Sequence, residues 1–412
     1  MFSFLTKIQK QAESKIPKNW RLFHATDFHT LMYPCFTFCR ILGIFPYRIN
    51  ATSFEISKPL VILSAIIVYV CCIRVLIVIY NVNVSGKIDM ADIPRKIHCN
   101  FYYALSIFIT IVTHILTSPR MRLLQTIAKI SSTLPTKSYQ KLSWLIHAKD
   151  IFSFLYVPIF IIILGTKINV DVLFAFSITH INLLVLQVNM MYVNCVCILK
   201  ACFKRINDNL INMKTLVVND ASHLGLINHE HRRSFLLLKL KVLQKQYLEV
   251  SDTVQMLNMI FSLQLVATII MHFGDIVFNL YYYVLMQQSM FIIPTEKQLF
   301  HKYFVMWMVF FFIKTIFLTW ACETGKKQAL KIGTTIHDVL NCTSDKQIKN
   351  ELKLFSLHIL HRTNTFSAKV FTVDASFFAA VVGNVTTYVF ILIQFLNIIN
   401  SCNEKAIHNI MF

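Results

Sequence analysis

Glycine and proline are scarce in this chain of 412 residues, which contains eight of the former and nine of the latter. This scarcity excludes collagen-like, linker-like and low-complexity chains, which depend on these two residues. Charged residues are also few, at 15%, whereas hydrophobic residues make up 56%. A soluble protein of this length has too little interior to hide so many apolar side chains. The composition therefore indicates an all-α protein that crosses a membrane several times.

Acidic residues are half as frequent as basic ones, with 20 Asp and Glu against 40 Lys and Arg. The resulting net charge of +20 is compatible with a nucleic-acid partner. The basic residues, however, sit in loops between apolar runs, as expected when Lys and Arg remain on the cytosolic side of a membrane. We therefore expect a lipid bilayer as the surrounding medium and no nucleic-acid partner.

Several functional signals are missing. The first 20 residues have neither the long apolar core nor the cleavage site of a signal peptide, so we expect the N-terminus to be retained. The 11 cysteines do not form the pattern of a secreted disulfide framework, although Cys99 and Cys402 are candidates for one pair. No phosphate-binding loop, zinc-protease motif or nucleophile elbow occurs. We expect no enzymatic activity, no cofactor and no metal site.

Seven apolar runs are long enough to span a bilayer. They are residues 59–80, 99–117, 150–166, 173–199, 256–288, 303–321 and 373–399. An eighth run, 31–46, is shorter and contains Pro34 and Arg40, which favours a re-entrant or interfacial helix.

The distribution of Lys and Arg gives the orientation. If the N-terminus is cytosolic, the inner segments (1–58, 118–149, 200–252 and 322–372) hold 31 of them and the outer segments hold 7. The chain then divides into an N-terminal segment (1–58), helices 1–4 (59–200), a cytosolic extension (201–255), helices 5–6 (256–321), an anchor segment (322–372), helix 7 (373–399) and an extracellular tail (400–412). This asymmetry predicts a cytosolic N-terminus and an extracellular C-terminus.

Long helices are predicted on the cytosolic side. Residues 232–288 contain one glycine and no proline, so a continuous helix would measure about 85 Å, against about 30 Å of hydrocarbon. Residues 346–367 are also predicted to be helical. These helices could be solvated loops or a packed domain. An apolar stripe at helical spacing favours packing; it consists of Leu236, Leu240, Leu243, Tyr247 and Val250.

The last apolar run carries a narrow polar edge. At 100° per residue, its polar residues fall with Gly383 and Phe390 within about 80° of one another. These polar residues are Ser376, Thr387, Gln394 and Asn397, whereas Tyr388 lies on the far side and Phe395 on the flank. Such an edge either hydrogen-bonds to neighbouring spans or faces a water-filled path. A path would require several copies around an axis.

The same run contains a recognisable motif. In "TYVFILIQF" (Thr387 to Phe395), Thr-Tyr is followed by five apolar residues and Gln-Phe, which resembles the signature of insect gustatory receptors. Upstream, the pairs Phe355–Ser356 and Phe366–Ser367, with Phe371 and Asp374, are similar to the family's approach to its last span. The segment from Asp27 to Tyr47 also resembles these receptors, but only the last stretch of the chain carries a specific motif.

The resemblance implies a fold and a function. Insect gustatory receptors are seven-span proteins with a cytosolic N-terminus, which form tetrameric ligand-gated cation channels. The last helix of each subunit lines a central pore, and the cytosolic helices form the anchor between subunits. The resemblance implies Gln394 and Phe395 as gate residues. With the polar edge and the motif added, the candidate pore and gate residues are Gln394, Phe395, Thr387, Phe390, Asn397 and Tyr388. The implied partners are a small-molecule tastant, permeating cations, and further copies or related receptors, in the plasma membrane of sensory neurons.

The candidate ligand residues follow from the position of polar side chains in the spans and not from the resemblance. Polar side chains lie in the outer half of the fifth span, at offsets that place three of them on one helix face, and at similar depth in the fourth span. They are His180, Asn182, His272, Asp275, Asn279 and Tyr282. A structural network between the spans is the alternative to a tastant pocket. Lys314, in the sixth span, either extends toward the cytosol or pairs with Asp275.

We therefore expect a tastant-gated nonselective cation channel. The alternatives are a G-protein-coupled-type receptor and a transporter. The first needs an outer N-terminus, which the charge distribution contradicts. The second needs helices broken at mid-membrane, and the few Gly and Pro in the spans show no paired pattern.

Overall fold

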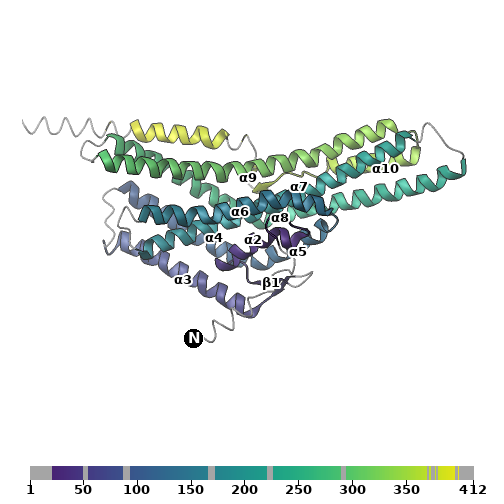
Figure 1. The fold of residues 1–412 in the computed structure, drawn as a ribbon. Helices are drawn as coiled ribbons and strands as arrows, with labels where there is room; N and C mark the ends of the chain where they lie inside the picture. Colours follow the sequence, from purple (N-terminus) through teal and green to yellow (C-terminus); the bar gives the residue numbers. More distant parts are fainter. Residues whose placement is uncertain are drawn as a thin grey trace, which may run out of the picture.

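The computed structural model describes residues 21–49, 54–86, 93–165, 172–219, 226–288, 294–368, 371–372, 376, 379–394 and 398. Its elements are α2 (Phe28–Ile41), β1 (Tyr47–Ile49), β2 (Phe54–Ile56), α3 (Lys58–Asn83), α4 (Ile93–Ile115), α5 (Thr117–Ser131), α6 (Thr136–Gly165), α7 (Val172–Asn219), α8 (Leu226–Gln288), α9 (Pro294–Cys342), α10 (Lys346–Leu360), β3 (Ser367–Ala368) and β4 (Phe371–Thr372). A further helix, Ala379–Gln394, is called the last helix below. Figure 1 shows an elongated helical bundle that is broad at one end and narrow at the other.

The expectation of an all-α membrane protein is confirmed. Among the described residues, five helices are long and apolar enough to cross a membrane: α3, α6, α7, α8 and α9. The pair α4 and α5, bent by 60° at their junction, qualifies as a sixth when the two are taken together. The last helix is apolar but shorter. Each of the seven predicted runs thus corresponds to one apolar helix or helix pair.

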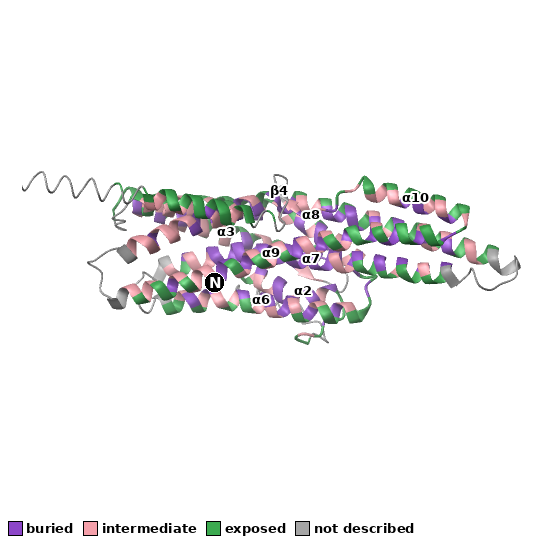
Figure 2. Cartoon of the chain, turned by 90° about the horizontal axis from the view of Figure 1, so that it is seen from above, coloured by how far each residue is buried: buried purple, intermediate pink, exposed green. Residues whose placement is uncertain are grey.

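The helix at the centre of the bundle is α7. Every residue in its most apolar window is buried inside the subunit, whereas only 17% of the corresponding window of α3 is. A helix that is apolar all round is stable only when neighbours enclose it. Contacts with α6, α8 and α9 provide this enclosure, and residues 181–199 of α7 are all buried. Much of the purple in Figure 2 lies around the label α7.

The narrow end of the bundle consists of the long helices beyond the apolar spans (Figure 1). The helix α8 has 63 residues and is therefore about 95 Å long. The predicted stripe from Leu236 to Val250 is buried. Of the two alternatives for these helices, a packed domain is therefore confirmed and solvated loops are not. At its centre, the Tyr247 ring lies 5.9 Å from that of Phe203 on α7 and 5.5 Å from that of Phe355 on α10.

The helix α10 ends earlier than predicted. It stops at Leu360, and residues 361–366 connect it to the β3–β4 pair without helical structure, so the helical prediction for 346–367 is wrong at its C-terminal end. Asn258 on α8 accounts for the difference. Its Nδ2 donates to the Thr365 carbonyl at 2.7 Å, and its Oδ1 accepts from the Ser367 N–H at 3.1 Å. These bonds satisfy backbone groups that a helix would otherwise use.

The N-terminal helix α2 occupies the interior beside α5, α6 and α7. It begins with a capping box between Asp27 and Thr30, and Leu31 and Cys35 are fully buried. A turn at Gly43, whose φ is 75°, leads into the antiparallel β1–β2 pair. The predicted run 31–46 is thus a helix enclosed by protein followed by a turn. Its depth in a membrane stays a prediction.

We predict that Leu352→Ala will destabilise the protein by about 2–5 kcal/mol, because it leaves a cavity in the fully buried contact between α10 and the long helices. Leu357→Ala on the same helix is the matched control, since Leu357 is exposed in the subunit. Thermal unfolding of the purified protein in detergent measures both variants. Equal losses of stability would contradict the assigned packing.

Candidate pore helix and ligand residues

The last helix packs through one apolar side. Val385 is buried against Ile276 of α8 and Phe311 of α9, and Val381 and Val389, one turn away on either side, pack on the same cluster. These residues recur every four positions, which places them on one face of the helix. In Figure 1 the last helix, in yellow, lies along the outside of the broad part of the bundle.

The predicted polar edge lies on the opposite side of the helix and faces away from the subunit. Thr387, Phe390 and Gln394 are all exposed, and Phe390 retains 61% of its accessible surface. The Thr387 hydroxyl donates to the Gly383 carbonyl at 3.1 Å, within the same helix. Apart from the adjoining backbone of its own helix, no described atom lies within 4 Å of where a Cβ on Gly383 would stand. The edge is therefore not held by neighbouring spans of its own subunit.

The remaining pore candidates differ in position. Tyr388 lies on the flank, where its ring meets that of Phe273 on α8 edge-on at 5.7 Å, so it helps to attach the helix to the bundle. Ser376 is exposed, like the edge. Phe395 and Asn397 lie outside the described residues, as does Cys402, the candidate partner of Cys99.

Asp275 is buried between α8 and α4. Its Oδ1 lies 3.0 Å from Nε2 of His98, and its backbone carbonyl accepts from Asn279 Nδ2 at 2.6 Å. Tyr282, two helical turns beyond Asp275 on α8, lies 6.1 Å from the His98 ring between ring centres. The Arg95 guanidinium stands 5.4 Å from the centre of the Tyr282 ring. Two predicted ligand residues, Asp275 and Tyr282, therefore lie beside two basic side chains of α4.

His272 faces a different neighbour. Its Nε2 lies 2.8 Å from the ammonium of Lys314 on α9, so His272 rather than Asp275 is the hydrogen-bond partner of Lys314. The two side chains line an internal cavity of about 30 Å³ between α7, α8, α9 and Val381 of the last helix. Such a cavity holds about one water molecule and is far smaller than a site for a drug-sized ligand.

The two candidates of the fourth span, His180 and Asn182 on α7, contact neither Asp275 nor Lys314 through any described hydrogen bond. Nδ1 of His180 lies 3.3 Å from the Cys71 sulfur on α3, and Asn182 donates to the Ile178 carbonyl of its own helix at 3.0 Å. The six predicted ligand residues are therefore distributed over three helix contacts rather than brought together in one pocket.

Sequence reasoning missed the basic side chains of α4. A carboxylate in an apolar span requires a partner, and His98 was a candidate near the outer end of the second span. It also missed Arg120 at the start of α5, which is buried and donates to Gln264 Oε1 on α8 at 3.0 Å. Arg120 holds the bent junction of α4 and α5 against α8.

We predict that His98 and Asp275 are energetically coupled. His98→Ala and Asp275→Asn should each lower the stability of the detergent-purified protein, and the double variant should lose about 1–3 kcal/mol less than the sum, because the shared contact is lost only once. The measurement is thermal unfolding of the four proteins in a double-mutant cycle. Strictly additive losses would show that the two side chains do not interact.

Two comparisons of the sequence with known proteins identify related proteins. A family model described as 7tm Chemosensory receptor matches residues 32–396. Putative gustatory receptor 28b of Drosophila melanogaster is 30% identical over 150 residues, which is 36% of this chain. The match spans only 32% of that relative's length.

Two solved structures of the insect olfactory receptor OR5 from Machilis hrabei are also similar, one of them in complex with eugenol. Their TM-scores are 0.65 for the complex and 0.66 for the other structure, at 11% and 12% identity. The matches cover 89% and 88% of this chain and 98% and 97% of those chains. At this identity the likeness shows the fold. The matched family model runs from α2 to beyond the last helix, and the C-terminal motif points to the same group, so the chain belongs to the 7tm chemosensory receptor family of insect chemoreceptors.

Proposed function

We propose that this multi-pass membrane receptor is a tastant-gated, nonselective cation channel in the plasma membrane of chemosensory neurons. The proposed N-terminus is cytosolic and the C-terminus extracellular, in agreement with the distribution of Lys and Arg. The support for taste comes from the C-terminal motif and from the relative named as a putative gustatory receptor. The support for a channel comes from the last helix.

The observation that carries the proposal is the uncovered polar edge of that helix. Thr387 and Gln394 face away from their own subunit, on a helix whose opposite side packs through apolar residues. In hydrocarbon, polar groups in this position are costly unless they meet water or another polar group. A closed ring of identical subunits brings the edges together around one axis and supplies both. We propose four copies, or a mixture of this chain with related receptors, as the resemblance implies.

The proposed gate lies along this edge. Phe390 projects a large apolar ring from it, and Gln394 follows one turn later. Rings of such side chains close a pore by narrowing it and by excluding water. Phe395 and Asn397 extend the proposed gate beyond the described residues. The edge carries no charged side chain among the residues described here, so only weak discrimination between cations is expected.

A route from ligand to gate runs through the contact between α8, α9 and the last helix. His272 and Lys314 line the cavity that Val381 closes, and Phe273 on α8 touches Tyr388. A tastant that widens this region would bind more tightly to a state in which the last helix has moved. Such a difference in affinity between two states is what drives opening. His98, Asp275 and Tyr282 form the second proposed contact area for the tastant.

We predict that the receptor expressed alone, or with a related receptor as partner, will give tastant-evoked cation current in voltage-clamped cells. The current should persist when G-protein signalling is blocked, because the pore is part of the receptor itself. A matched control is the same cell without the receptor. Loss of all current on blocking G proteins would overturn the channel proposal in favour of a G-protein-coupled-type receptor.

We predict that Gln394→Ala will change the relative permeability of Na⁺, K⁺ and Ca²⁺ or the tastant concentration for half-activation by about fivefold or more, because the loss of one edge interaction of about 1 kcal/mol corresponds to a factor of about five. Asn384→Ala is the control, since Asn384 is exposed on the same helix but lies off the edge. Current recordings compare the two variants. Identical responses would contradict the assignment of Gln394 to the gate.

A further inference from the structure

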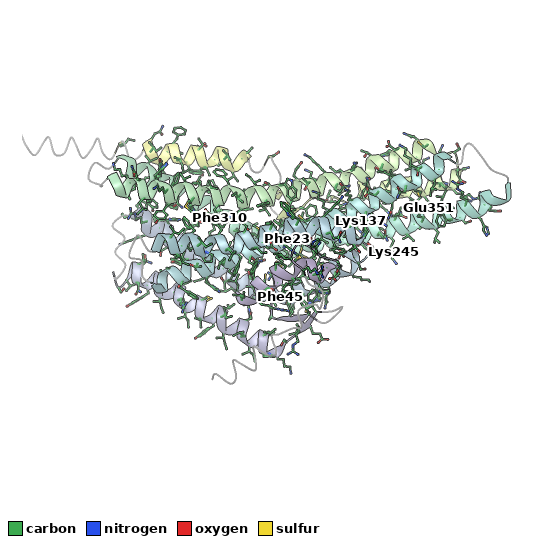
Figure 3. All side chains as sticks on the ribbon, in the orientation of Figure 1. Phe23, Phe45, Lys137, Lys245, Phe310 and Glu351 are labelled. Carbon is green, nitrogen blue, oxygen red and sulfur yellow. The ribbon has the colours of Figure 1, made fainter. Side chains whose placement is uncertain are left out.

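A second cavity, separate from the proposed ligand and pore residues, lies between the start of α6, the middle of α7 and α9. Its volume is about 330 Å³. Five basic side chains line it, and we call them the basic pocket: Lys137, Lys141, Lys200, Lys204 and Arg205. Asp208 is the one acidic residue in the described lining. Figure 3 labels Lys137, which lies where the broad part of the bundle narrows toward the long helices.

The positive charge of the basic pocket is not neutralised within the subunit. Lys200 donates to the Thr324 hydroxyl at 2.9 Å and stands 4.7 Å from the centre of the Trp320 ring. In the part of the chain that the structure describes, no carboxylate forms an ion pair with the other four basic side chains. Like charges held around one cavity repel one another. A multiply charged anion would remove this repulsion.

The surface around the basic pocket indicates where that anion comes from. On α6, exposed apolar residues begin just after the exposed Trp144. On α9, a row of exposed apolar residues at helical spacing ends at Trp320. These two rows are Phe152, Leu155, Ile159 and Ile162 on α6, and Val305, Val309, Phe312 and Ile316 on α9. Tryptophan is enriched at the level of lipid headgroups. The basic pocket therefore lies where lipid-facing surface meets water.

We propose that the basic pocket binds a group carrying two or more phosphates, presented by an inositol phospholipid of the cytosolic leaflet. The cytosolic side rests on the orientation given under the proposed function. A headgroup with several phosphates matches several cations, whereas phosphatidylserine, with one net negative charge, leaves most of them unpaired. Arg205 supplies a planar fork for one phosphate, and the lysines supply point charges for the others. Basic pockets between helices at this level bind such headgroups.

The test measures binding by the full-length purified receptor and needs no channel current, so it is independent of the proposed function. The probe is short-chain phosphatidylinositol 4,5-bisphosphate. Lys141→Gln with Lys204→Gln should weaken binding at least about tenfold, because each lysine near a phosphate contributes about fivefold. The control is Lys245→Gln with Lys331→Gln, which removes the same charge from exposed lysines outside the pocket and should leave binding within about twofold.

Three further measurements complete the test: a folding control, binding to phosphatidylserine vesicles, and binding of soluble inositol trisphosphate. All four variant lysines are exposed in the subunit, and thermal unfolding confirms that the pocket variant is folded. Equal loss of binding in the pocket and control variants would overturn the proposal, as would equal binding to phosphatidylserine vesicles of the same total charge. Soluble inositol trisphosphate should bind more weakly than the lipid. If it binds equally and loses affinity in the pocket variant, the phosphate site stands and the lipid source is overturned.

Discussion

The burial of the middle of α7 is the constraint on which the rest of the structure depends. This helix has no Gly or Pro over its 48 residues, and neighbouring helices enclose residues 181–199 on all sides. Two of its buried polar side chains find partners on neighbouring helices: Asn194 donates to Asp150 of α6 at 2.9 Å, and Asn207 accepts from Thr335 of α9 at 2.7 Å. These bonds fix the register of α6 and α9 against α7, and with it the position of both cavities.

The periphery of the bundle is organised differently from its centre. Within residues 379–394, the last helix is held by a small cluster around Val385 and by the edge contact of Tyr388, and the hydroxyls of Thr386 and Thr387 bond within the helix itself. A weakly attached helix can change position at low cost, whereas α7 cannot. The same chain thus combines a fixed central helix with a last helix suited to movement, which is what a gated pore requires.

Much of this organisation could be predicted from the sequence because it depends on periodicity and length. The seven apolar runs, the long helices and the buried stripe around Tyr247 follow from local patterns that no distant contact overrides. The existence of the polar edge was also predictable, but the pattern alone left open whether Thr387 faces neighbouring spans or points away from the subunit. The partners of His272 and Asp275 were not predictable from the sequence. Residues three apart on α8 lie on one face, yet the helix lies in a corner between α9 and α4, and each side chain reaches a different neighbour. The end of α10 depends on Asn258, more than 100 residues earlier in the chain.

The unbroken length of α8 has a mechanical consequence. A straight rod of about 95 Å that tilts by about 5° around its midpoint moves its two tips by about 4 Å in opposite directions. Because α8 has no proline in 63 residues, no proline hinge is present to absorb such a tilt. If α8 tilts as one rigid unit, a displacement near His272 moves the opposite end of the helix, beyond Leu236, and a contact that holds this end resists motion near His272.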